Sequence, residues 1–235
     1  MVILRPSAER GQADHGWLLA KHSFSFAEYY DPEEMGWGAL RVINEDRVQP
    51  GAGFGMHGHR DMEIVTYILS GGLEHKDSLG NGGVIQRGEV QRMSAGKGIL
   101  HSEFNPSASE ETHLLQIWIE PAQRGGSASY EQQELPVAGM HNRWRLVASP
   151  DGAEGSTTIG QDARLYASVL EAGKTLEYAL SSARLAYVQV ICGALTINGK
   201  NLSAGDGAKI AAESLLEFVA QEESEFLLFD LPPIA

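Results

Sequence analysis

The chain has 235 residues, of which 43% are hydrophobic and 21% are charged, so it can bury one large core or the cores of two domains. The net charge is −13, and residues 1–135 and 136–235 each hold more Asp and Glu than Lys and Arg. Because phosphate backbones are bound through clustered basic side chains, we expect no direct nucleic-acid binding.

The N-terminus and the cysteine count indicate a cytoplasmic protein. Residues 1–11 lack the apolar core of a secretory signal, and no apolar run approaches the roughly 20 residues that cross a bilayer. The single cysteine, Cys192, permits no internal disulfide. Within its strand pattern we expect it to be a small buried hydrophobe. The oligomeric state stays open, with a monomer as one option.

The first part of the chain contains predicted strands without paired candidate metal ligands. In residues 22–30, HSFSFAEYY, phenylalanines alternate with serines, which is the period of a half-buried strand. Residues 38–48 predict a second strand and residues 62–69 a third. We interpret His15 and His22 as structural residues unless they lie near a metal.

Two short segments each carry two metal ligands at positions i and i+2. His57 and His59 lie in residues 51–71, and His101 and Glu103 lie in residues 94–105. Residues two apart share one face of a strand but not of a helix. Two such strands would direct three imidazoles and a carboxylate at one point, with apolar neighbours around a flat organic ligand: Phe54, Met56, Ile99 and Leu100.

The donor types restrict the metal. Imidazoles and a carboxylate without a thiolate suit Fe, Cu, Ni, Mn, Co or Zn better than Ca or Mg. We expect one divalent ion with one or two open coordination positions, which distinguish a catalytic site from a closed structural one. Among these metals Fe(II) is our first choice.

Further strands follow the first ligand pair. The sequence GNGG at 80–83 predicts a hairpin turn, with residues 84–93 pairing back, and residues 113–119 form the most apolar strand of this half. Residues 120–136 are polar and rich in Gly, Ser and Gln, as connections between domains often are.

The second half repeats the strand pattern of the first. Residues 187–199 resemble 63–75, residues 205–214 resemble 88–97, and residues 225–233 resemble 112–121. This self-similarity indicates a duplicated domain, with residues 1–135 binding metal and residues 136–235 lacking ligands, because the last histidine is His141. Residues 171–180 and 211–218 fit helices or strands of the repeat. We predict an all-β chain of two jelly-roll β-sandwich barrels packed together.

The motif spacings resemble the cupin superfamily. Gly51 is followed by five residues, His57-Gly58-His59, three residues, Glu63, seven residues and Gly71. The second motif runs from Gly88 through Ser94-Ala95-Gly96 and His101 to Asn105, with serine in place of the usual proline and the histidine two residues late. These departures, the HSE at 101–103 and the phrases HSFSFAEYYDP and HGHRDMEIVTYILSG resemble the pirin family, in particular the bacterial pirin-like quercetin 2,3-dioxygenases.

This resemblance implies a specific activity. A flavonol would bind by its 3-hydroxyl to a metal at His57, His59 and His101, and would react with O₂ to open the ring and release carbon monoxide. Glu103 would be a ligand, the general base, or both, and the pirin-type HSE favours it over the rival carboxylate Glu63. The partners would be an aromatic small molecule and O₂. The alternative is a non-enzymatic pirin-like regulator that uses its metal as a redox or ligand switch.

Overall fold

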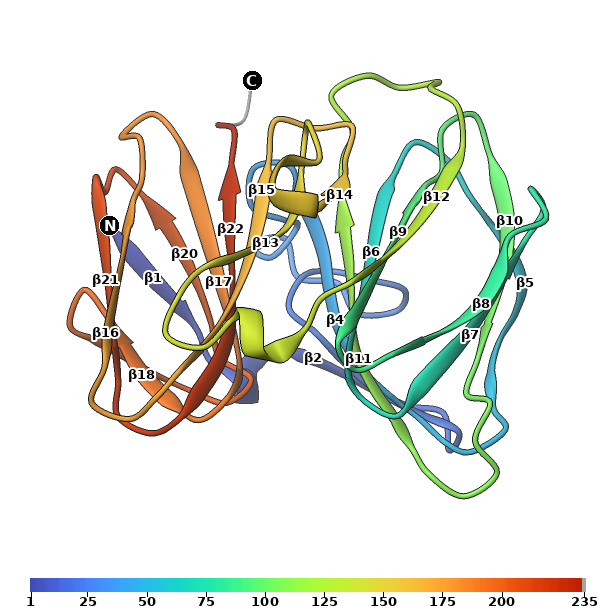
Figure 1. Ribbon diagram of the computed structural model, residues 1–235, viewed down its shortest axis with the longest axis horizontal. Helices are drawn as coiled ribbons and strands as arrows, with labels where there is room; N and C mark the ends of the chain where they lie inside the picture. The colour runs from blue at the N-terminus through green and yellow to red at the C-terminus, as the bar shows by residue number, and fades with distance from the viewer. Residues whose placement is uncertain (234–235) are drawn as a thin grey trace.

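The structure is a computed structural model that describes residues 1–233, and these residues form two β-sandwiches that lie side by side (Figure 1). Three short 3₁₀ helices join strands: η1 (Ser7–Glu9), η2 (Val137–Gly139) and η3 (Ala153–Gly155). Within the described range, no helix is both long and apolar enough to span a bilayer. The predicted all-β fold of two packed sandwiches is confirmed.

The N-terminal sandwich consists of a seven-stranded and a four-stranded sheet. The large sheet contains, in spatial order, β12 (Ser129–Glu134), β9 (Glu89–Ser94), β6 (Glu63–Ser70), β11 (Thr112–Ile119), β4 (Leu40–Val48), β3 (Leu18–His22) and β2 (Gly11–Asp14). The small sheet contains β5 (Gly53–His59), β10 (Ile99–Phe104), β7 (Gly72–Asp77) and β8 (Gly82–Gln86).

The C-terminal sandwich has the same construction. Its large sheet contains β1 (Val2–Arg5), β20 (Gly207–Ala211), β17 (Leu185–Cys192), β22 (Ser224–Leu231), β15 (Arg164–Leu170), β13 (Arg145–Ser149) and β14 (Thr157–Thr158). Its small sheet contains β16 (Thr175–Ala179), β21 (Leu215–Ala220), β18 (Ala194–Ile197) and β19 (Lys200–Ser203). The segments that fit helix or strand are therefore strands β16 and β21.

The internal repeat appears as matching sheet orders. Strands β9, β6 and β11 correspond in order to β20, β17 and β22, as the sequence similarity predicts. One edge of each large sheet comes from a distant part of the chain, because β1 pairs with β20 while β12 pairs with β9. The N-terminal strand thus lies in the C-terminal sandwich (Figure 1). The domain boundary at residue 135 stays a prediction.

The two large sheets share one apolar core. Tyr67 of β6 and Ile117 of β11 belong to the same buried cluster as Leu227 and Phe229 of β22. Every residue of β22 is buried, and six of the eight residues of β6 are buried. Strands covered on both faces become continuously apolar instead of alternating, which explains the unbroken runs in both sequences.

Two predicted elements differ from the structure. The strand expected over 22–30 does not form. Strand β3 ends at His22, and residues 26–29 form a tight turn in which Ala27 has φ 50°. The alternation of phenylalanine and serine does not reflect a pleated strand. It reflects the burial of Phe24, whose ring lies 5.3 Å from that of Tyr187. The connection expected over 120–136 contains β12, a polar edge strand whose side chains carry no apolar alternation.

Candidate metal centre

Strands β5 and β10 place the first three ligand candidates together. The antiparallel register sets His101 directly opposite His57, and a β-bulge follows between His101 and Glu103. The strands approach closely near Gly53, where an added Cβ would lie 2.2 Å from the Glu103 carbonyl oxygen. Glycine at this position therefore permits the pairing on which the site depends.

The three imidazoles converge on one point. The ring nitrogens of His57, His59 and His101 lie within 4.8 Å of one another, and His57 Nε2 lies 3.0 Å from His101 Nε2. His57 Nδ1 donates to the Gly55 carbonyl at 2.8 Å, which leaves an Nε2 lone pair directed at His101. Two nitrogens that each bind one metal ion at about 2.1 Å and at right angles lie roughly 3.0 Å apart. The donor set therefore fits a single divalent metal ion.

Burial keeps two of these imidazoles neutral. Desolvation, followed by the nearby His57, lowers the pKa of His59 to about 4. Desolvation, with contributions from His57, His59 and His75, lowers the pKa of His101 to about 3. Metal ions bind the neutral imidazole, so these groups need to lose no proton near neutral pH.

Glu103 lies on β10 with His101, but it groups with His75 and His101 and lies outside the cluster of His57, His59 and His101. Its carboxylate accepts hydrogen bonds from Gln116 Nε2 at 3.0 and 3.3 Å, and it lies within 4.8 Å of a ring nitrogen of His101. Burial raises its pKa to about 7, against the opposing effect of the Gln116 hydrogen bond. A carboxyl with a pKa near neutrality can take up or release a proton during a reaction.

The rival carboxylate Glu63 lies elsewhere. It begins β6, and Asp61 at φ 50° separates that strand from β5, so the parity with His57 and His59 expected for an unbroken strand is lost. Its side chain accepts a hydrogen bond from Ser94 Oγ at 2.6 Å and faces Gly160 of the second half.

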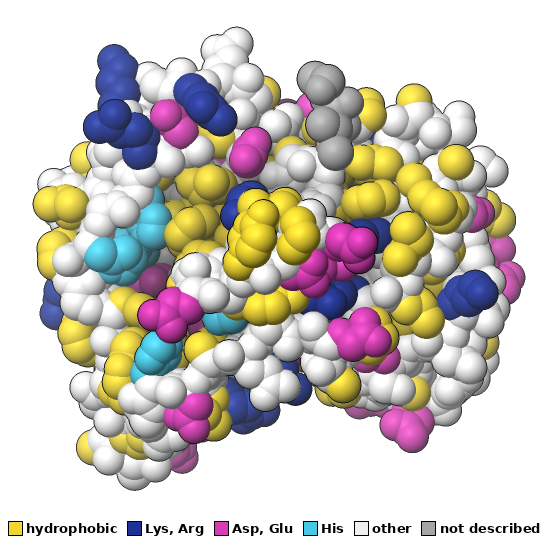
Figure 2. All heavy atoms as spheres, turned by 180° about the vertical axis from the view of Figure 1, so that it is seen from behind, with side chains coloured by type: hydrophobic (Ala, Val, Ile, Leu, Met, Phe, Trp, Pro, Cys, Tyr) yellow, Lys and Arg dark blue, Asp and Glu magenta, His cyan; other side chains and the backbone are white. Residues whose placement is uncertain are grey.

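A cavity of about 930 Å³ opens beside the imidazoles and is lined by His57, His59 and Glu103. Phe54 and Trp118 contribute apolar walls, and the volume is ample for an aromatic ligand of a few fused rings. Figure 2 shows histidines at the molecular surface beside hydrophobic side chains on this half of the molecule. The expected pocket residues Met56 and Leu100 instead point outward, at 60% and 51% exposure, and Ile99 packs in a separate cluster.

Sequence reasoning missed a polar wall of this cavity. Its members are His22, Asn44 and Asp46. His15, which like His22 was interpreted as structural from the sequence, also lines the cavity. His22 Nδ1 lies 2.8 Å from Asn44 Oδ1. Alternating strand positions 44 and 46 share a face, so Asn44 could have identified Asp46 once one of them was known to face the ligands.

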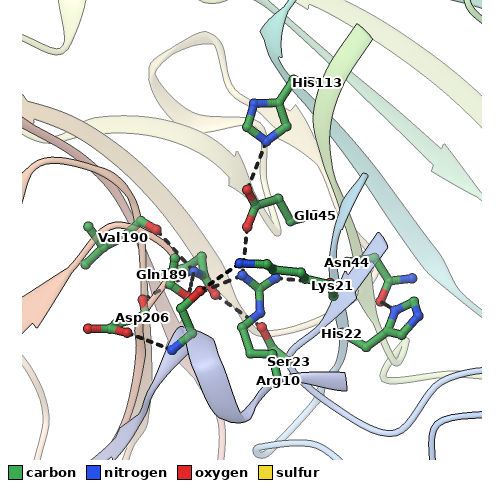
Figure 3. A network of polar contacts seen from close by, with 12 residues as sticks. Arg10, Lys21, His22, Ser23, Asn44, Glu45, His113, Gln189, Val190 and Asp206 are labelled. Carbon is green, nitrogen blue, oxygen red and sulfur yellow. Dashed lines mark hydrogen bonds and ion pairs between the residues drawn. The ribbon is translucent and has the colours of Figure 1, made fainter. Parts of the chain in front are cut away.

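Behind this wall a polar network joins the two sandwiches (Figure 3). Arg10 donates to one carboxylate oxygen of Glu45 at 2.7 Å, and His113 donates to the other at 3.0 Å. Burial alone would raise the Glu45 pKa, but these contacts lower it to about 2. Ser23 Oγ reaches Gln189 of the second half at 3.2 Å. The network fixes β4, which carries Asn44 and Asp46 of the polar wall.

Asp46 differs sharply from its neighbour Glu45. The Asp46 side chain is 4% exposed and its Oδ1 atom has no hydrogen-bond partner among the described residues. Burial, followed by the charge of Glu103, raises its pKa to about 7. A buried polar atom without a partner calls for an explanation, and a position beside a cavity supplies one in contact with a ligand.

Known proteins resemble the whole chain. The Pirin family model matches residues 4–119, and the model of the Quercetinase C-terminal cupin domain matches residues 146–231. Quercetin 2,3-dioxygenase of Escherichia coli K12 is 48% identical over 235 residues, which is 100% of both chains. A pirin-like protein of Caulobacter vibrioides is 44% identical over 98% of this chain and 99% of its own. The crystal structure of bacterial pirin YhhW from Escherichia coli, in complex with nickel(II), has 47% identity, covers 100% of both chains and gives a TM-score of 0.96.

Proposed function

This chain belongs to the pirin family, and we propose that it is a metal-dependent dioxygenase that opens the ring of a flavonol such as quercetin and releases carbon monoxide. The observation that carries the proposal is the convergence of three imidazoles, two of which, His57 and His59, line a 930 Å³ cavity. The full-length similarity to a quercetin 2,3-dioxygenase supports the same reaction.

We assign the metal to His57, His59, His101 and Glu103. A bound divalent ion supplies Lewis acidity and a template for substrate and O₂. Fe(II) remains our first choice among Fe, Cu, Ni, Mn, Co and Zn. Nickel(II) in the similar pirin structure shows that the related protein accepts a divalent ion of this class. In this proposal the C-terminal half, residues 136–235, repeats the strand order of the metal-binding half, has a packing role and holds no metal.

The residues of the chain divide the remaining work. Phe54 and Trp118 hold the flat rings and exclude water from the reacting face. Glu103 accepts the proton of the substrate 3-hydroxyl, and Gln116 orients its carboxylate through the 3.0 Å hydrogen bond. In the metal-free chain burial raises the pKa of Glu103 to about 7, and a bound divalent cation favours the carboxylate form that accepts the proton. Asn44 and Asp46 offer polar contacts to the other hydroxyls of the substrate.

Paired carboxamide variants test the assignment. Glu103→Gln should lower kcat for quercetin by about 10²–10⁴-fold, because an amide cannot accept the proton. Glu63→Gln is the matched control and should stay within about tenfold of the parent, because its carboxylate contacts Ser94 and not the cavity. Quercetin loss, O₂ uptake and CO release are measured in chains reconstituted with each metal in turn. The reverse ranking would assign the base to Glu63.

The same assay separates enzyme from regulator. If the parent chain carries one metal ion and turns over no member of a flavonol series with any of the six metals, the dioxygenase proposal is wrong. The non-enzymatic regulator then becomes the better description.

A further inference from the structure

A buried chain of polar contacts leads away from the metal centre through β7. His101 Nδ1 lies 3.5 Å from His75 Nδ1, and His75 Nε2 lies 3.2 Å from Asp77 Oδ2. The β10–β7 register produces this arrangement, because it pairs His101 with Asp77 and Glu103 with His75. The side chains of His75 and Asp77 are both 0% exposed.

The chemistry of the acceptor at the end of this chain orients every proton in it. An ionised carboxylate only accepts hydrogen bonds, so His75 Nε2 carries the hydrogen. Asp77 is kept in this role by three further donors: the backbone N–H groups of Leu79 and Asn81 and the Asn81 side-chain amide, at 2.9–3.2 Å. The Nδ1 of a neutral His75 is then an acceptor, and the group that faces it is His101 Nδ1.

We propose that His75 and Asp77 are positioning residues that fix the tautomer and ring orientation of the metal ligand His101. His101 Nδ1–H donates to His75, which leaves the Nε2 lone pair of His101 directed at His57 Nε2, 3.0 Å away. His57 is fixed in the same sense by the Gly55 carbonyl. Hydrogen bonds from the second nitrogen of a ligating imidazole commonly set its orientation and basicity. Here the carboxylate acts through an intervening imidazole.

The ring of His75 is held for this task. Tyr130 stacks on it with centroids 4.8 Å apart and planes inclined by 28°. Within residues 1–233, its nitrogens make hydrogen-bond contacts only with Asp77 and His101. His75 also lies near enough to His101 and Glu103 to suggest a ligand itself. We assign it a different role, because its Nε2 is engaged by Asp77 and its Nδ1 faces a nitrogen that must donate.

The test is designed around variants that keep the shape of the ring. The inference rests on the metal site proposed above but uses no turnover measurement. His75→Phe retains a flat ring against Tyr130 and removes both nitrogens. Asp77→Asn keeps an oxygen that can accept from His75 Nε2. His113→Phe is the matched control, because it removes another histidine bonded to a carboxylate, Glu45, without contacting a ligand.

Two readouts are measured on folded protein, as checked by circular dichroism. The first is the ¹⁵N spectrum of the imidazoles in the metal-free parent, which should show His101 as the Nδ1–H tautomer. The second is the dissociation constant for Ni²⁺ and Zn²⁺ by chelator competition. His75→Phe should weaken binding by about 10–100-fold, Asp77→Asn by less, and His113→Phe by under about threefold.

Several results would overturn the proposal. These are an Nε2–H tautomer of His101 in the parent, unchanged affinity in folded His75→Phe, or a second ion that requires His75. If His75→Phe does not fold, the spectrum of the parent still decides. Metal binding without flavonol turnover would reject the proposed function and leave this inference intact.

Discussion

The two sandwiches use the same order of strands for opposite purposes. In the N-terminal small sheet, β5 and β10 direct His57, His59 and His101 inward beside a cavity. In the C-terminal small sheet, the corresponding pair β16 and β21 buries Leu216 and Phe218 in an apolar cluster. The fold therefore does not dictate a site, and the inward residues of two strands decide between chemistry and packing.

The interiors differ in the same way. The C-terminal interior is filled by aromatic rings around Trp144, whose centroid lies 5.1 Å from Phe218 and 5.6 Å from Phe226. Its buried carboxyl Asp230 is neutralised by Arg184 and accepts from Tyr178 at 2.7 Å. The N-terminal interior instead leaves Asp46 unpartnered beside an open space. Unsatisfied groups and cavities cost stability, and their concentration in one sandwich indicates where function opposes packing.

The largest expected effect concerns metal content. The parent should bind one ion per chain, whereas His57→Ala and His101→Ala should each retain less than about a tenth of an ion, because each ligand contributes a large share of the binding free energy. His141→Ala is the control: it removes the exposed last histidine of the chain and should keep the full ion. Elemental analysis after dialysis gives the content. Full occupancy in both ligand variants would place the metal elsewhere, and a second ion would break the contrast between the sandwiches.

Local sequence patterns predicted those differences between the two sandwiches that depend on residue spacing along a strand. Ligand pairs at i and i+2 share a strand face in any sheet, so the convergence of His57, His59 and His101 could be anticipated, although their role as ligands stays a prediction. The absence of any histidine after His141 was equally plain. The fold followed from the repeat, because each copy carries the same apolar strands.

Contacts between strands could not be read from the sequence. His75 meets His101 only through the register of β7 on β10, which no local pattern specifies. Asp46 faces the cavity because β4 lies in the large sheet opposite the ligand strands. The polar edge strand β12 lacks the apolar alternation by which strands are recognised. Conversely, residues 23–30 show that alternation around the buried Phe24 but form no strand.

The second prediction concerns the packed sandwich. Phe218→Ala should lower the free energy of unfolding by about 3–5 kcal/mol, because it opens a cavity among stacked aromatic rings. Metal content should stay at one ion per chain, because the variant touches no ligand. Denaturant unfolding and elemental analysis measure the two quantities. Loss of metal from a chain that is still folded would show that the sandwiches are not independent.

The third prediction uses the unpartnered carboxyl of the open sandwich. The pKa of Asp46 is raised from 3.8 to about 7, so the folded chain holds this proton more tightly than the unfolded chain. Stability from Asp46 is complete below about pH 4 and is lost as the pH rises through about 7. Relative to the parent, Asp46→Asn should gain on the order of 1–4 kcal/mol in unfolding free energy between pH 4 and pH 8.

This difference is measured by urea unfolding of metal-free protein in chelator. The lowered pKa values of His59 and His101 make the free energy of unfolding change with pH in the opposite direction. They add stability that is lost as the pH falls through about 4 and about 3. Both chains share that contribution, so it cancels in the difference. Asp230→Asn is the counterpart in the packed sandwich and should lose stability by breaking the contact with Arg184. Parallel curves for parent and Asp46→Asn would contradict the assignment.

The smallest effect is expected at Cys192. The expectation of a buried thiol is wrong, because a β-bulge between Val190 and Cys192 shifts the register against β22 and leaves the side chain exposed. Cys192→Ser should therefore change the free energy of unfolding by less than about 0.5 kcal/mol, as exposed substitutions usually do. Turnover of quercetin at saturating metal should stay within about threefold of the parent, because the residue lies in the C-terminal sandwich, away from the cluster of His57, His59 and His101. Thermal unfolding and kcat are measured on the same preparation, so that lost stability is not mistaken for lost chemistry. A large fall in kcat at unchanged metal content and melting temperature would show that the packed sandwich takes part in the reaction.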